Sequence, residues 1–373
     1  MFIIGTRINQ LSQPSGIAED VLVDVRVSGI GNVAEADVRT HEDLAVLRQL
    51  PGVTSAAVVN QVPFQAGSWN TMVSTEPDGR GTSLAASQYN FGRGALDTFG
   101  LTLVAGRDFL PEEYVSSESL RGKKDLSHLK IPVILNQAVA NRLFPDGQAA
   151  GRSIYMGPYL ITVVGVVDTF KRATPMGGDR DASVIFPMEM NYNDGGFYLL
   201  RVAEPALRGQ VMAAAVDALT RHDPNRLIRE PRSYESVRAK HFSADRDMVG
   251  LLLIVSVLLL LVTALGIVGL ASFWVGQRTK QIGIRRALGA TRGQILGYFL
   301  TENVLLTTGG IVLGMLMAYG LNQWLMGQYA LPRLPWMWLP VGAVVLWLLG
   351  LASVYGPARR AASIAPAVAT RTN

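Results

Sequence analysis

Three long runs without a charged side chain occupy the last third of this sequence, and they constrain its fold more than any other feature. They extend from Met248 to Gln277, from Asn303 to Pro332 and from Leu334 to Ala358. A helix needs about 20 apolar residues to cross the ~30 Å hydrocarbon core of a bilayer, and each run is long enough. Buried helices of soluble proteins seldom run beyond about 25 residues without a charge. The runs therefore predict three membrane spans, at about residues 249–276, 295–326 and 335–357.

The charged residues divide the chain into two parts of different character. Residues 1–247 carry 25 Lys and Arg and 28 Asp and Glu, whereas residues 248–373 carry nine Lys and Arg and one acid, Glu302. The chain has no cysteine, which excludes thiol catalysis, cysteine-ligated zinc and iron–sulfur clusters. This division excludes a uniformly globular enzyme and favours a near-neutral folded domain on a cationic membrane anchor.

The short loops between the spans predict how the chain crosses the membrane. Cations without any acid lie between the first two spans and again after the third, whereas the loop between the second and third spans has one cation. The first group is Arg278, Lys280, Arg285, Arg286 and Arg292. Positively charged loops stay in the cytoplasm, so this loop and the C-terminus are expected there. The large domain is then expected in the periplasm of a multi-pass protein of the cell inner membrane.

The first residues of the chain look like the end of another apolar helix. The segment Met1–Gly5 is apolar apart from its glycine, and polar residues follow it. A large domain must also be exported, and no signal peptide precedes it. We therefore expect residues 1–9 to be the remnant of a first transmembrane span.

Residues 10–245 are predicted to form an α+β domain outside the membrane. Val21–Val27, a helix from Thr40 to Leu50 and the apolar run Val53–Val59 form a β-α-β unit. Further strands are predicted over residues 131–135, 154–167, 184–187 and 197–202, and helices over residues 137–144 and 205–221. A last helix is expected over residues 234–247, running directly into the membrane. The fold class is thus an α-helical membrane protein with an α+β extracytoplasmic domain.

Catalytic and metal-binding patterns are poor in this domain. Its four histidines are far apart, and no two of them stand four residues from each other. There is no Gly-x-Ser-x-Gly nucleophile motif, and the Gly-x-Gly at residues 29–31 lacks the surroundings of a dinucleotide site. No catalytic residue and no metal site is therefore predicted.

The loop after the first span is the most informative stretch of the sequence. It reads QRTKQIGIRRALGATR over residues 277–292. Gly289 suits the position that ends a helix in a left-handed conformation. Thr291 followed by Gln294 fits a capping box, so a new helix is expected to begin there. The short helix Ile282–Leu288 between these signals is too short to be stable alone and needs a partner, either lipid headgroups or a groove on another protein.

This loop resembles the cytoplasmic loop of the FtsX/MacB-like ABC transporter permeases, which carry Q-R-T-x-E-I-G-I-R-x-A-L-G-A between two spans. Gln281 stands where that pattern has Glu. The C-terminal segment P-A-R-R-A-A at residues 357–362 resembles the close of these permeases, although the following residues depart from it. Weaker similarities follow in the same order, in residues 99–109, 136–145, 151–152 and 163–168.

The resemblance implies a domain plan and a set of coupling residues. A MacB-like periplasmic core over residues 10–245 would combine a porter-like subdomain with an inserted β-rich subdomain at about residues 95–190. An FtsX-like transmembrane domain would occupy residues 246–373. The residues that the resemblance assigns to ATPase coupling are Arg278, Lys280, Gln281, Ile282, Gly283, Ile284, Arg285, Arg286, Leu288 and Gly289. The alternative for the cations is that they only keep the loop in the cytoplasm.

The resemblance also implies a function in transport, for efflux or export. A permease of this kind couples a separate cytoplasmic ATPase to conformational change in the periplasm, which is called mechanotransmission. The sequence has no Gly-x-x-x-x-Gly-Lys-Ser/Thr loop, so ATP is expected on a partner subunit, and neither enzymatic activity nor a cofactor is expected here. The expected partners are the ATPase, a second permease in a homodimer or a pair, a periplasmic adaptor protein and membrane lipid, but no nucleic acid.

Two features of the membrane half leave alternatives open. Glu302 is either a functional intramembrane acid or the headgroup-level partner of a loop arginine. Gly310, Gly314 and Ala318 form a ridge of small residues for close helix packing, within one protomer or between two.

Two other classes of function compete with the transporter. One is an FtsX-like signalling unit in which ATPase motion activates a periplasmic partner. The other is a passive membrane-tethered binding protein, which needs no structured cytoplasmic loop.

Overall fold

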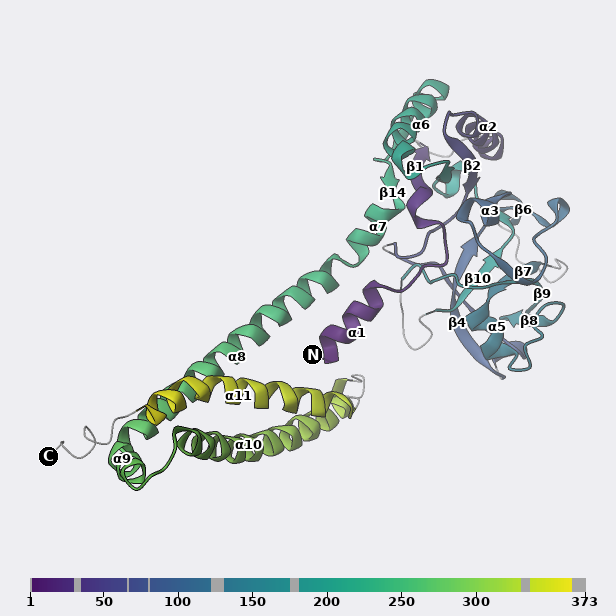
Figure 1. The fold of residues 1–373 in the computed structure, drawn as a ribbon. Helices are drawn as coiled ribbons and strands as arrows, with labels where there is room; N and C mark the ends of the chain where they lie inside the picture. The colour runs from purple at the N-terminus through teal and green to yellow at the C-terminus, as the bar shows by residue number, and fades with distance from the viewer. Residues whose placement is uncertain are drawn as a thin grey trace. The chain divides into compact units, whose positions relative to one another are not determined.

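The computed structural model describes residues 2–29, 35–65, 67–79, 81–121, 131–174, 181–329 and 336–363 (Figure 1). These residues form two compact units. The α/β unit comprises Gln13–Ser243, and the helical unit comprises Met1–Ser12 with Ala244–Asn373.

The first sheet of the α/β unit is built from both ends of its sequence. Its strands β1 (Leu22–Gly29), β2 (Val53–Val58), β12 (Phe197–Val202) and β13 (Arg226–Ile228) lie in the order β13-β1-β12-β2, and β14 (Arg232–Ser233) also pairs with β1. All these pairings are antiparallel, so β1 and β2 run parallel with β12 between them. The predicted β-α-β unit is confirmed, with one strand inserted into it. The order is that of a ferredoxin-like fold, and the assignment of this part as a porter-like subdomain stays a prediction.

Two helices cover one face of this sheet, α2 (Ala36–Arg48) and α6 (Arg208–His222). Alternate residues of β1, namely Val23, Val25 and Val27, are buried against them, because successive side chains of a strand point to opposite faces. Leu47 of α2 and Leu219 of α6 belong to the same core. Leu22 and Asp24, on the opposite face of β1, are buried as well, so the strand is covered on both faces.

The second sheet has seven strands and lies between β2 and β12 in the sequence. Its order is β5-β9-β7-β10-β4-β3-β8, and β8 also pairs with β9. Six strands thus form a closed ring, which a single residue pair between Ser74 and Tyr155 completes. The strands are β3 (Asn70–Ser74), β4 (Ser83–Asn90), β5 (Leu103–Gly106), β7 (Pro132–Asn136), β8 (Ser153–Met156), β9 (Tyr159–Val167) and β10 (Ser183–Phe186).

This sheet is the inserted β-rich part of the domain. Its strands come from residues 70–186, whereas the sequence placed the insertion at about residues 95–190. The insertion begins earlier than predicted because it includes β3 and β4, which were not predicted from the sequence. A two-stranded sheet of β6 (Val115–Ser116) and β11 (Met188–Glu189) accompanies it.

The remaining elements of the α/β unit are short. The helices are α3 (Ala95–Phe99), α4 (Ser117–Leu120), α5 (Gln137–Leu143) and α7 (Tyr234–His241). Single 3₁₀ turns cover Glu19–Val21, Pro77–Gly79, Pro111–Glu113, Tyr192–Asp194 and Pro205–Leu207.

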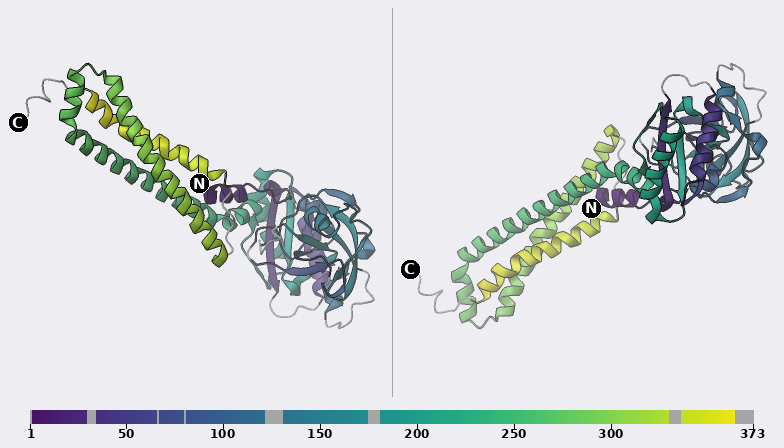
Figure 2. Two further views of the ribbon diagram at one scale, coloured as in Figure 1. Left: turned by 90° about the horizontal axis from the view of Figure 1, so that it is seen from below. Right: turned by 90° about the horizontal axis from the view of Figure 1, so that it is seen from above.

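The helical unit contains α1 (Phe2–Leu11), α8 (Ser243–Gln277), α9 (Thr279–Ala287), α10 (Arg292–Tyr329) and α11 (Trp338–Ala362). Three segments are long and apolar enough to cross a membrane: Ser243–Gln277, Arg292–Gly327 and Trp338–Ala362. They contain the three predicted spans, except for the start of the third, which falls at residues 335–337. Residue 335 lies outside the described residues. Figure 2 shows α10 and α11 side by side with α9 at one end of the bundle.

The helix expected over residues 234–247 is interrupted. Helix α7 ends at His241, Phe242 has φ −93° and ψ 7°, and α8 begins at Ser243. The prediction of one uninterrupted helix is therefore wrong, because Phe242 leaves the helical conformation and is buried in the α/β unit. The expectation that residues 1–9 end a further span stays a prediction.

Candidate functional site

Helix α9 and its flanking turns adopt the local structure that the sequence predicts. The chain passes Gly289 with a φ of +100°, a conformation that favours glycine. The capping box is present: the Gln294 backbone N–H donates to Thr291 Oγ1 at 3.2 Å, and the Thr291 N–H donates to Gln294 Oε1 at 2.8 Å. The helix covers Thr279–Ala287, so it begins three residues before the predicted start.

One face of α9 is anchored in the helical unit. Ile282 is 5% exposed, and Gly283 is buried as well. Ile282 belongs to a core, here called the anchor cluster, that also draws on α10 and α11. Its buried members are Ile282, Ile295, Phe299, Val354, Ala358, Ala361 and Ala362. The C-terminal P-A-R-R-A-A segment thus packs its alanines against the short helix, which supplies the partner that a nine-residue helix needs.

Another face of α9 presents apolar side chains to the surroundings. Ile284 is 54% exposed and Leu288 is 83% exposed, while Lys280 one turn before Ile284 is exposed as well. The sequence placed all three in one loop, but only the tertiary structure separates them from buried Ile282.

Glu302 is paired with an arginine of the loop. Arg278 Nη1 lies 3.0 Å from both Oε1 and Oε2 of Glu302, and its guanidinium lies 5.1 Å from the ring centroid of Trp274. This is the pairing that the second alternative for Glu302 predicts, and its position at the headgroup level stays a prediction. The pair joins the N-terminal boundary of α9 to α10 and compensates two partly buried charges.

The small-residue ridge does not make the close contact within this protomer. A Cβ atom added at Gly310 or Gly314 would meet no atom of the described residues within 4 Å outside its own helix. Instead, a Cβ added at Gly350 of α11 would lie 3.3 Å from Asn303 Nδ2 and from Thr307 Oγ1 of α10. The tight α10–α11 packing therefore lies at Gly350, which the sequence analysis did not single out. The ridge lines a groove of about 670 Å³ between α8, α10 and α11, and its packing partner stays a prediction.

The α/β unit contains a strained residue close to the end of α7. Phe64 has a φ of +61° although it is not glycine, and its side chain is buried. Its ring packs against Phe242 with centroids 5.0 Å apart, and the Arg238 guanidinium lies over it at 5.1 Å. Arg238 also forms an ion pair with Glu19 at 2.5 Å. These contacts of Phe64, Phe242 and Arg238, here called the aromatic joint, fix the residue that directly precedes α8.

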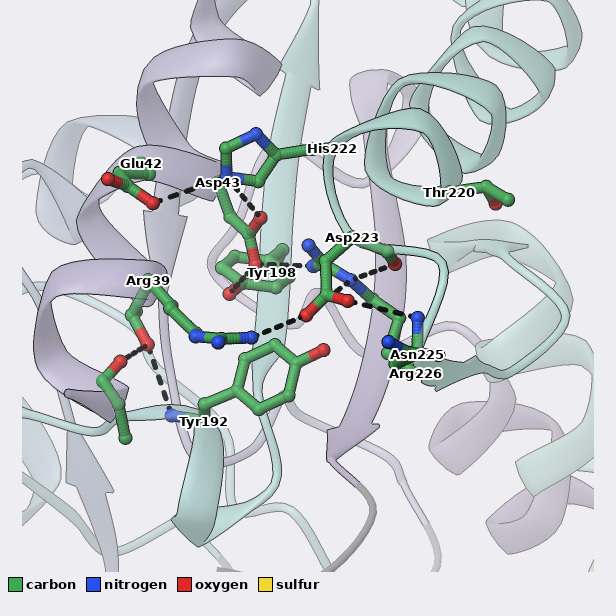
Figure 3. Close-up of polar contacts among 12 residues, drawn as sticks. Arg39, Glu42, Asp43, Tyr192, Tyr198, Thr220, His222, Asp223, Asn225 and Arg226 are labelled. Atoms are coloured by element: carbon green, nitrogen blue, oxygen red, sulfur yellow. Dashed lines mark hydrogen bonds and ion pairs between the residues drawn. The ribbon is translucent and has the colours of Figure 1, made fainter. Parts of the chain in front are cut away.

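A buried polar network fixes α2 to the turn after α6, as Figure 3 shows. Asp43 of α2 is fully buried and accepts hydrogen bonds from Tyr198 Oη at 2.7 Å and from Arg226 Nη1 at 2.6 Å. His222 Nε2 lies 3.9 Å from the other carboxylate oxygen. Burial raises the pKa of Tyr198 well above its ordinary value, and the Asp43 carboxylate raises it further.

This network, here called the clamp, is structural, because its hydrogen bonds hold α2 against β12 and β13. Within the part of the chain that the structure describes, no group of three His, Asp or Glu side chains is arranged to hold a metal ion. His128 lies outside the described residues. Asp43 and Arg226 are 183 residues apart, and sequence reasoning missed them because no local pattern links them.

Comparison with known proteins identifies both parts of the chain. The model of the MacB-like periplasmic core domain matches residues 1–218, and that of the FtsX-like permease C-terminal matches residues 253–366. Macrolide export ATP-binding/permease protein MacB of Rhodospirillum rubrum is 31% identical over 246 residues, covering 63% of this chain and 37% of that protein. MacB of Chromobacterium violaceum is 27% identical over 253 residues, covering 65% and 36%. The chain thus spans about a third of these relatives' length. An uncharacterized ABC transporter permease of Bacillus subtilis, YvrN, is 27% identical over 262 residues, covering 67% of this chain and 64% of YvrN.

Proposed function

Since the chain belongs to the ABC transporter permeases of the MacB/FtsX type, we propose that it couples ATP hydrolysis on a partner to conformational change in its α/β unit. The single observation that carries this proposal is the two-sided character of α9. Its inner face is fixed by Ile282 in the anchor cluster, while Ile284 and Leu288 are exposed. A force applied to the exposed face would therefore be passed to α10 and α11 rather than lost in a flexible loop.

The proposed path continues along the chain from α9 toward the α/β unit. Arg278, the residue before α9, directly follows α8, a helix of 35 residues. At its other end α8 follows Phe242, which packs against the strained Phe64. A long helix between two fixed ends is suited to carry motion as a lever. The aromatic joint is proposed as the point at which the α/β unit receives it.

Orientation, partners and transport direction are parts of the same proposal. The cations of the α9 loop favour the cytoplasm for α9 and for the C-terminus. With the permease in the inner membrane, the α/β unit is then proposed to lie in the periplasm. The ATPase partner is supported by the names of the MacB relatives, which combine ATP binding and permease. Their names also support export, and a second permease copy and a periplasmic adaptor are proposed with it. A signalling role on the same lever is the second candidate.

The exposed face of α9 can be tested with one substitution and a matched control. Ile284→Asp places a charge in the proposed contact, whereas Leu227→Asp places one on a strand residue of the α/β unit that is 64% exposed, against 54% for Ile284. We expect Ile284→Asp to weaken binding of the phosphate-loop ATPase to the full-length chain by at least about thirtyfold, since a lost interface anchor costs at least about 2 kcal/mol. Leu227→Asp is expected to leave recovery unchanged.

The measurement is co-purification from the native host, with quantitative mass spectrometry and ATP hydrolysis of the recovered complex. Wild-type recovery of the ATPase and wild-type hydrolysis with Ile284→Asp would contradict the proposal. If no ATPase is recovered with any variant, the passive tethered-protein interpretation replaces it. Envelope proteins recovered with the complex separate export from signalling.

A further inference from the structure

A cleft of about 520 Å³ lies between α9 and the first turns of α10, distinct from the exposed Ile284 face. It is lined by Arg278, Gln281, Ile282, Arg285, Leu288, Gly289, Ala290, Gln294, Ile295, Tyr298 and Phe299. Lys280 and Ile284 of the same helix do not line it. The cleft therefore opens on a second side of α9, and it shares Leu288 with the face proposed to meet the ATPase.

The charge of this cleft is positive. Its lining contains two arginines and no carboxylate. Arg278 is compensated by Glu302, but Arg285 is exposed, and its guanidinium lies over the Tyr298 ring at 4.9 Å. Gln281, one turn before Arg285 on α9, also lines the cleft and is a neutral amide. Among the described residues no carboxylate pairs with Arg285, so the cleft keeps a guanidinium, a group that matches phosphate geometry well.

The surroundings of the cleft would suit the headgroup of a lipid. Its floor is apolar, formed by Ile282, Ile295 and Phe299, which are all less than 10% exposed. It lies where α8 ends and α10 begins, at the boundary of two spanning helices. Tyr298 and Arg285 at this level are the residue types that occupy the membrane interface. A basic cleft between helices at this depth suits an anionic lipid.

We propose that this cleft binds the phosphate of an anionic phospholipid. Arg285 donates to the phosphate oxygens, while the lipid's apolar part extends over Ile282, Ile295 and Phe299. The neutral amide of Gln281 makes the site selective for a lipid with net negative charge over a zwitterionic one. The proposal requires the membrane position of the cleft and does not rest on ATPase coupling, so either proposal can fail without the other.

The test is titration of the full-length detergent-solubilised chain with phosphatidylglycerol, phosphatidylcholine and inorganic phosphate, followed by native mass spectrometry. Arg285→Gln is expected to weaken phosphatidylglycerol binding about tenfold, because a charge-assisted hydrogen bond is lost. Gln281→Glu is expected to weaken it similarly, and Gln and Glu have about the same helix propensity, so a folding defect does not explain the loss. Lys280→Gln removes the same charge outside the cleft and is expected to change little.

Each other pattern of results overturns the proposal. Equal losses with Lys280→Gln and Arg285→Gln would mean that the loop attracts lipid only through its total charge. Equal affinity for phosphatidylcholine and phosphatidylglycerol would remove the selectivity that Gln281 is proposed to give. Inorganic phosphate binding with the same variant pattern, without lipid binding, would make the cleft a site for free phosphate instead.

Discussion

The buried pair of Asp43 and Arg226 allows one prediction to be worked out in detail. Neither side chain is more than 1% exposed, and Arg226 Nη1 lies 2.6 Å from the Asp43 carboxylate. Asp43→Asn keeps the size of the side chain and an acceptor for Tyr198, but it leaves the Arg226 charge buried without its main partner. Removing one member of a buried ion pair costs about 3–5 kcal/mol. The free energy of unfolding of the α/β unit is expected to fall by that amount.

A nearby ion pair provides the control. Asp223 pairs at 2.7 Å with Arg39, whose side chain is 46% exposed, and lies 3.9 Å from Arg226 Nε, beyond hydrogen-bond distance. An exposed pair such as that with Arg39 contributes about 0–1 kcal/mol. Asp223→Asn should therefore cost less than about 1 kcal/mol. Adding Arg226→Met to Asp43→Asn removes the stranded charge, so the double variant is expected to be more stable than Asp43→Asn alone.

The assay is hydrogen exchange of the full-length chain, followed by mass spectrometry on peptides from α2 and β12. Since about 1.4 kcal/mol corresponds to a tenfold change, global exchange should be about a hundredfold to several thousandfold faster in Asp43→Asn. It should be less than about tenfold faster in Asp223→Asn. Equal exchange in the two variants, or a double variant less stable than Asp43→Asn, would refute the reasoning about the buried charge.

Two further predictions concern the α9 turn and alkaline pH. Gly289→Ala should destabilise the end of α9 by about 1–2 kcal/mol, because the position has a φ of +100°. Gly293→Ala should instead stabilise α10 by about 0.5–1 kcal/mol, because alanine favours a helix over glycine. Thermal unfolding of the two variants in detergent measures both effects. Burial raises the pKa of Tyr192 to about 12, so the unfolded chain loses this proton first, near pH 10. The contribution of Tyr192 to the free energy of unfolding is complete below pH 10 and is lost as the pH rises toward 12. Urea unfolding at several pH values measures this loss, and Tyr192→Phe, which cannot ionise, is the control.

Local signals in the sequence were sufficient for the membrane helices and for the turn after α9. Apolar runs determine the spans because a helix in lipid satisfies its own backbone hydrogen bonds, so length and composition suffice. Gly289 and the Thr291–Gln294 capping box act within three residues, and their structure depends little on the rest of the chain. The partner of Glu302 could also be anticipated, because few cations lie near a lone acid in an apolar domain.

The tertiary structure decided the features that depend on distant partners. Strands β3 and β4 are rich in polar and small residues, and they are strands because neighbouring strands pair with them. The clamp of Asp43 and Arg226 joins residues far apart in the sequence. Ile282 and Ile284 are identical in type and two positions apart, yet only the packing of α10 and α11 makes one an anchor and the other a surface. Sequence spacing specifies local conformation, whereas burial is decided by whichever elements the fold brings together.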